Sequence, residues 1–240
     1  MSEGLTSVRG HGLLAIWSDL DLTREDEFDT WHLQEHLAER VNVPGFHRAR
    51  RYVRTAPPAP HGAILLTLYE TETVDVMASP GYIERLDNPT PLTRQTVPLM
   101  ENMRRTALQL SASSGQGIGG HLAVWQFRPS LEKADAARQR IAGGVLDRAM
   151  APVGVVACHL YEPAIEATRA KDDTTEGRAT DTVAESPRWV LLVESAHERG
   201  LTEARYGIAE VVSAISDDSQ VTVETFRLAV VLDGPGEDQS

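Results

Sequence analysis

The sequence predicts an α+β fold in which two βαββαβ units follow one another, and three recurring patterns carry this prediction. Leu-Ala-Ile-Trp at 14–17 recurs as Leu-Ala-Val-Trp at 122–125, and the spacing from Gly45 to Tyr52 recurs from Gly154 to Tyr161. An apolar run also ends in glutamate twice, at 64–70 and at 189–194. Because these patterns keep their order and spacing, we expect an internal repeat: a first unit at 11–112, a Gly/Ser linker at 113–120, and a diverged second unit at 121–233.

The first unit contains four strand-like runs and two helical regions. Residues 13–17, 48–54, 63–69 and 105–111 are short and rich in β-branched or aromatic residues, which favours strands. A helix is expected from near Thr23, followed by acidic residues at 25–27, to the stop signal at 42–45. A second helical region, 74–103, is interrupted by prolines.

The second unit repeats this order with a clearer helical pattern. We expect a strand at 121–127, helices at 131–150 and 201–215, and a last strand at 226–232. Residues 162–187 carry seven acids, three bases and almost no large apolar residues, which predicts a long, solvated acidic loop. In strands such as 64–68 the residues that point to either face of the sheet are apolar, so both faces should be covered. Helices cover one face, and a second sheet is expected to cover the other.

Composition limits the partners. The chain has 35 acidic and 23 basic residues, a formal charge of −12, which disfavours nucleic acid and anionic membrane surfaces. Because Cys158 is the single cysteine, an internal disulfide is excluded. The chain lacks a run of about 18 apolar residues, so no membrane span is expected, and its first residues lack the apolar core of a signal peptide. We therefore expect a cytoplasmic protein whose partner is a small-molecule substrate.

The segment 31–41 contains the strongest candidate for chemistry. On an α-helix, Trp31, Leu33, Leu37, Ala38 and Val41 form an apolar face, and His32, Glu35, His36 and Glu39 lie opposite. His36 is nearest the boundary between the faces, beside Arg40. Nine residues before Gly154, the position equivalent to His36 is Val145, so the histidine belongs to one unit only. This one-sidedness favours a functional role over an architectural one.

Three interpretations of this cluster remain open. The pattern His32-x-x-Glu35-His36 is that of some zinc proteases, but the sequence offers no convincing third ligand, so we expect no metal. Alternatively the cluster is a solvated helix face, which is the expectation for His32. Thirdly, His36 acts as a general acid or base in a cavity, with Glu35, Glu39 or Arg40 setting its orientation and protonation.

The same segment carries a family resemblance. Between Trp31 and Tyr52 the chain contains Trp-x-x-x-Glu-His-x-x-Glu-Arg followed by Val-Pro-Gly-Phe and Arg-Arg-Tyr. This pattern resembles the EthD-like branch of the dimeric α/β-barrel superfamily, as do Asn-Pro-Thr-Pro at 88–91 and Met-Arg-Arg-Thr at 103–106. The resemblance implies two ferredoxin-like sheets closing into a barrel, here within one chain, so that the protein is a monomer or a homodimer. It also implies a cavity between sheet and helices, which in relatives holds small aromatic or polyketide-like molecules.

Together these features lead to one leading hypothesis and two alternatives. We expect a small-molecule enzyme that performs acid/base chemistry without a cofactor, as a cyclase, isomerase, lyase or monooxygenase. Its substrate-binding candidates are Trp17, Trp31, Arg51, Tyr52 and Tyr82. Core packing is the competing role for Trp17, Tyr52 and Tyr82, and a solvated strand edge is the alternative for Arg51. The recurrence of Trp17 as Trp125 favours packing for Trp17. The alternatives are a non-catalytic ligand-binding or structural barrel, and a haem- or metal-binding barrel that uses His36, His47 or His159.

Overall fold

Eight antiparallel strands form one closed barrel in the computed structural model, which describes residues 7–129, 132, 134–180, 187–216 and 221–235. Around the barrel the strands follow the order β1-β3-β2-β8-β5-β7-β6-β4. Their bounds are β1 Gly12–Leu20, β2 Phe46–Ala56, β3 Ala63–Thr71, β4 Met100–Gly115, β5 His121–Phe127, β6 Val155–Pro163, β7 Trp189–Ser195 and β8 Thr222–Asp233. Each half of the chain supplies four neighbouring strands, and the halves join where β2 pairs with β8 and β4 with β6.

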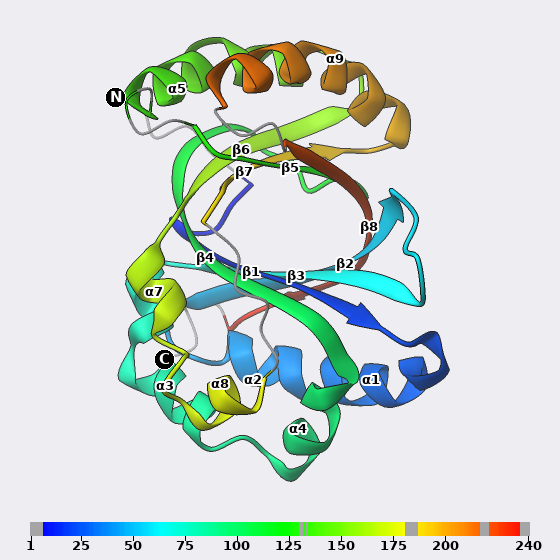
Figure 1. The fold of residues 1–240 in the computed structure, drawn as a ribbon, viewed down its shortest axis with the longest axis vertical. Coiled ribbons are helices and arrows are strands. Elements are labelled where there is room, and N and C mark those ends of the chain that lie inside the picture. The colour runs from blue at the N-terminus through cyan, green and yellow to red at the C-terminus, as the bar shows by residue number, and fades with distance from the viewer. Residues whose placement is uncertain (1–6, 130–131, 133, 181–186, 217–220, 236–240) are drawn as a thin grey trace.

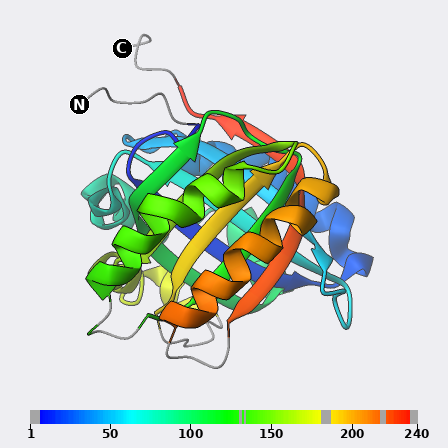
Figure 2. The same cartoon turned by 90° about the horizontal axis from the view of Figure 1, so that it is seen from above.

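Helices cover the barrel on two opposite sides (Figure 1). The first half contributes α1 (Glu25–Trp31), α2 (Leu37–Val41), α3 (Pro80–Asp87) and α4 (Pro91–Thr96). The second contributes α5 (Ala134–Arg140), α6 (Leu146–Met150) and α9 (Glu198–Ile215), which cross the other sheet in Figure 2. Every helix in the described part of the chain is too short or too polar to span a bilayer.

The barrel interior contains an apolar cluster and more than one group of buried charges, among them the ion pair of Arg54 on β2 with Glu224 on β8 at 2.5 Å. Leu13, Trp17, Tyr52 and Phe226 belong to its apolar cluster. Arg50 on β2 lies at 2.9 Å from Glu70 on β3 and at 2.6 Å from Glu194 on β7, and all three side chains are 1% exposed. Arg50 also donates a hydrogen bond of 3.0 Å to the hydroxyl of Tyr52. An arginine from the first half thus pairs with a glutamate from each half, and Arg48 lies at 3.6 Å from Glu70 as a second cation.

The strand register corrects the predicted equivalence of Trp17 and Trp125. Leu13 pairs with Glu70, and Leu122 pairs with Glu194, so Leu13 corresponds to Leu122 and Trp17 to Gln126. Trp17 consequently points into the barrel, whereas Trp125 packs in the apolar cluster beneath the helices. A shift of one residue moves a side chain to the opposite face of a sheet. The similarity of 14–17 and 122–125 is therefore out of register with the strands.

The predicted acidic loop is also corrected over the residues that the structure describes. It contains α7 (Ile165–Arg169) and α8 (Thr175–Ala179), and its residues 181–186 lie outside the described part. The Thr174 hydroxyl accepts a hydrogen bond from the Gly177 amide and thereby caps α8. Lys171, Thr174 and Glu176 are buried, because α8 packs against α3 of the first half (Figure 1).

Candidate functional site

A π-helical turn places the two predicted histidines of the first half. It spans His32–His36 between α1 and α2, and a second such turn spans Ile141–Val145 between α5 and α6. Each ends nine residues before a glycine with positive φ, Gly45 at 87° and Gly154 at 96°. The turn therefore occurs in both halves, whereas the histidines occur in one.

The π-helical turn explains why the predicted helix faces are wrong here. His32 is 3% exposed and His36 is 7% exposed, while Leu33, predicted on the apolar face, is 36% exposed. A π-helical turn contains one residue more than an α-helical turn, so the side chains after it are rotated relative to the predicted faces. His32, the first residue of the turn, lies on the side of α1 that buries Phe28 and Trp31, so it is buried and does not lie on a solvated face.

Aromatic rings surround both imidazoles. The His36 ring lies 4.3 Å from the Trp31 ring and 5.7 Å from the His32 ring, measured between centroids, and His32 stacks on Phe28 at 4.9 Å. The Trp31 indole donates a hydrogen bond of 3.0 Å to Thr93 on α4. The rings are thus fixed between the helices and the first sheet.

Charged side chains continue this buried layer beneath α8. Arg40 donates a hydrogen bond of 2.5 Å to Glu176, Lys171 lies at 3.6 Å from Glu176, and the Arg40 guanidinium lies 5.8 Å from the centre of the Tyr82 ring. Arg105 on β4 donates to the Thr168 carbonyl. We call the following set the polar layer: His32, His36, Glu39, Arg40, Arg105, Lys171 and Glu176.

Burial controls protonation in the polar layer. Burial, reinforced by Arg40, His32 and Lys171, holds the pKa of His36 well below its usual value, and burial with Arg51 lowers the pKa of His32 to about 3. Burial outweighs Glu176 and lowers the pKa of Lys171 to about 8. Burial also raises the pKa of Glu39. At neutral pH both imidazoles are therefore uncharged.

Buried polar atoms without hydrogen-bond partners are concentrated on this side of the barrel. Of the fourteen such atoms in the described residues, eight lie between the first sheet and its helices: Nδ1 of His32 and of His36, Oε2 of Glu39, Nη1 of Arg40, Nε of Arg51, Oγ1 of Thr96, and Nε and Nη2 of Arg105. The matching layer of the second half is an apolar cluster. A buried polar atom without a partner costs about 1–3 kcal/mol, so such a concentration needs an explanation beyond packing.

The other predicted site residues are divided between the layer and the barrel. Tyr82 lies against Arg40, and Arg51 donates a hydrogen bond of 2.6 Å to Asp29, so both are on the helix side of the first sheet. Glu35 accepts a hydrogen bond of 2.5 Å from Thr90 at the start of α4. Tyr52 and Trp17 point into the barrel and are separated from His36 by the sheet. The catalytic and substrate-binding roles of all nine residues stay predictions.

Sequence reasoning missed Lys171, Glu176 and Arg105. The first two lie in the predicted acidic loop, where the capping sequence Thr174-x-x-Gly177 was the available signal of a helix. Among the described residues, no group of three His, Cys, Asp or Glu side chains is arranged to hold a metal ion.

Comparison with known proteins establishes the fold. No protein-family model and no curated protein matches the chain. Solved structures do match: an anthrone oxidase-like protein has a TM-score of 0.62 at 12% identity, covering 97% of each chain. Two putative monooxygenases also match, one from Fusobacterium nucleatum (TM-score 0.58, 7% identity, 94% of this chain and 98% of the other) and one from Lactobacillus acidophilus (0.57, 9%, 93% and 96%).

The chain has the fold of ferredoxin-like dimeric α/β-barrel proteins. At these identities the likeness covers the arrangement of strands and helices alone. Fold does not determine function, because one fold carries many chemistries. The function therefore has to be argued from the polar layer.

Proposed function

We propose that the protein is a small-molecule enzyme that moves a proton on an aromatic substrate without a cofactor, with His36 as the base. The observation that carries the proposal is the group of buried, partnerless polar atoms around His36, set against the apolar layer of the second half. The names of the structural neighbours, an anthrone oxidase-like protein and putative monooxygenases, are consistent with an enzyme acting on a small molecule.

The protonation states suit this role. A general base must be uncharged to accept a proton, and burial with its cationic neighbours keeps His36 uncharged. Nδ1 of His36 has no hydrogen-bond partner in the described residues, so it is available to a substrate. Trp31 fixes the ring from one side at 4.3 Å.

The proposed step is the removal of a proton from a carbon beside a carbonyl group. The C–H bond breaks, the proton moves to His36, and the electron pair moves to the carbonyl oxygen to form an enolate. Arg40 and protonated Lys171 stabilise that negative oxygen, since fixed positive charge in a buried site stabilises developing anionic charge strongly. Return of the proton to another atom of the substrate completes an isomerisation or cyclisation. In an elimination the enolate instead expels a β-substituent, which leaves with the proton, and no oxidant or reductant is needed in either case.

Access to the layer requires α8 to move. Glu176 connects α8 to Arg40 and Lys171, and these contacts cover the layer from the side of α3. We propose that substrate enters when these ion pairs separate. Their closure would then exclude water, which strengthens electrostatic interactions within the site.

Exchange of carbon-bound hydrogen tests the proposal directly. Anthrone, an aromatic ketone with acidic methylene hydrogens, is incubated with the protein in D2O, and deuterium incorporation is followed by NMR. We expect wild-type protein to accelerate the exchange and His36→Gln to lose about 100-fold of that acceleration, the usual contribution of a general base.

The matched control is His61→Gln, which removes an exposed histidine and should leave the rate unchanged. Equal rates for wild-type protein and His36→Gln, or no acceleration over buffer, would contradict the proposal.

We further propose that the two halves are diverged copies of one unit, and that the chain belongs to the EthD-like branch. The equivalent strand orders, π-helical turns and glycines with positive φ support the first statement. The motif between Trp31 and Tyr52 supports the second. Because each strand is paired on both sides within one chain, we also propose that the barrel needs no second copy.

A further inference from the structure

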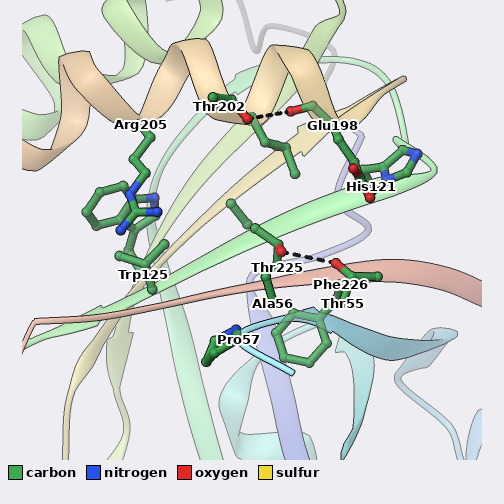
Figure 3. A pocket seen from close by; sticks show the side chains of 13 residues that line it. Thr55, Ala56, Pro57, His121, Trp125, Glu198, Thr202, Arg205, Thr225 and Phe226 are labelled. Atoms are coloured by element: carbon green, nitrogen blue, oxygen red, sulfur yellow. Dashed lines mark hydrogen bonds and ion pairs between the residues drawn. The ribbon is translucent and has the colours of Figure 1, made fainter. Parts of the chain in front are cut away.

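A cleft of about 560 Å³ lies on the second half of the barrel, away from the polar layer. Figure 3 shows it between α9, the outer faces of β5 and β8, and the end of β2. Its lining includes Trp125, Arg205, Thr225 and Pro57, and none of the nine residues predicted for the site. The volume is within the range of small-molecule sites, about 300–1,000 Å³.

The arrangement of α9 creates this cleft. The helix packs across β5 and β7, whereas the first part of β8 lies beside it (Figure 2), and α2 contacts β8 on the other side of the barrel. The outward residues of β8 in the cleft, Val223 and Thr225, are small and half-buried. The cleft therefore follows the β2–β8 junction, where the two halves of the chain meet.

The floor of the cleft is apolar and aromatic, and its rim carries a positive charge. Trp125 is buried beneath the helix layer and exposes only 3% of its surface, and Ala123 and Val223 extend the floor beside it. Arg205 on α9 is exposed, and within the described part of the chain it makes no hydrogen bond or ion pair. A planar ring on this floor would place an acidic substituent within the reach of this guanidinium, which has no partner among the described residues.

A histidine and a glutamate occupy another part of the rim. Nδ1 of His121 lies 3.8 Å from Oε1 of Glu198, and it is a buried atom without a hydrogen-bond partner. Figure 3 shows both side chains on the side of the cleft away from Arg205. A hydroxyl group can both donate and accept a hydrogen bond, so it suits a place beside an imidazole and a carboxylate.

We propose that this cleft binds a small hydroxylated aromatic carboxylate, with the ring against Trp125, the carboxylate at Arg205 and the hydroxyl at His121 and Glu198. The inference is independent of the proposed chemistry at His36, since the two sites share no residue. Arginine favours carboxylates because its parallel N–H groups match the two oxygens. The carboxylate should therefore contribute much of the affinity.

Calorimetric titration with 4-hydroxybenzoate tests the cleft, and the isosteric but uncharged 4-hydroxybenzamide shows the contribution of the carboxylate. We expect saturable 1:1 binding of the acid and at least about tenfold weaker binding of the amide. Arg205→Met should weaken binding of the acid by a similar factor and leave binding of the amide unchanged. Thr225→Phe, which fills the cleft, should abolish binding of both.

Arg199→Met is the matched control, because Arg199 is an exposed arginine on the same helix that does not line the cleft. Circular dichroism of each variant verifies folding. Absence of saturable binding by wild-type protein, equal binding of acid and amide, or an equal effect of the Arg199 and Arg205 substitutions would overturn the proposal. Anthrone exchange by Thr225→Phe should match wild type whichever result is found, which separates this site from the polar layer.

Discussion

Replacement of Arg50 by methionine should strongly destabilise the barrel. The guanidinium lies 2.9 Å from Glu70 and 2.6 Å from Glu194, and both carboxylates are 1% exposed. Removing one partner from a buried ion pair costs about 3–5 kcal/mol, because a buried charge is left without compensation. For a chain of 240 residues, about 2–4 °C per kcal/mol converts this to a fall in Tm of about 6–20 °C.

Urea unfolding followed by tryptophan fluorescence and circular dichroism measures this loss. Arg24→Met is the control, because Arg24 and Glu27 form an exposed ion pair that should contribute less than about 1 kcal/mol. A triple variant, Arg50→Met with Glu70→Gln and Glu194→Gln, should recover most of the stability, because all three charges are removed together and Arg48, 3.6 Å from Glu70, keeps its ion pair with Asp233 at 2.9 Å. A loss below about 1 kcal/mol for Arg50→Met, or a triple variant less stable than the single one, would refute this reasoning.

Two further predictions concern the ion pairs of Glu176 and the buried histidines. Glu176→Gln should lower the free energy of unfolding by about 2–4 kcal/mol and speed hydrogen exchange at 165–179, since Arg40 loses its carboxylate. Glu166→Gln, at an exposed position of α7, should have little effect, and equal exchange in the two variants would contradict the role of α8 as a cover. Burial lowers the pKa of His32 to about 3 and of His159 to about 4, so the unfolded chain binds more protons below pH 6.5. The free energy of unfolding should therefore decrease as the pH is lowered from 6.5 to 4, by up to about 1.4 kcal/mol per pH unit for each histidine. Urea midpoints that do not change with pH in this range would contradict this prediction.

The strands could be predicted because their determinants are local and recur, whereas closure into a barrel was expected from the family resemblance. Short apolar runs indicate strands, and the glycines before β2 and β6 mark the same turn in each half. Trp17 and Trp125 were wrongly matched because the alignment of the similar segments 14–17 and 122–125 differs by one residue from the alignment that strand pairing gives. Register depends on pairing with another strand, here through Glu70 and Glu194, which a comparison of segments does not contain.

The candidate site was less predictable for two physical reasons. The π-helical turn adds one residue and changes which side chains of 31–41 share a face, and no local signal in this segment indicated it. Lys171 and Glu176 belong to a polar, acidic segment that composition assigns to solvent. Their burial depends on Arg40 in the other half, a contact between residues 136 positions apart.

The pH profile of anthrone exchange tests most directly the claim that His36 is an uncharged buried base beside a protonated lysine. The value of kcat/KM should stay level from about pH 7.5 down to pH 6, because the pKa of His36 is well below 6.5, and it should fall above about pH 8 as Lys171 loses its proton. Lys171→Met should remove that alkaline decline. An acid limb near pH 6.5, as expected for a solvent-exposed histidine, would contradict the account.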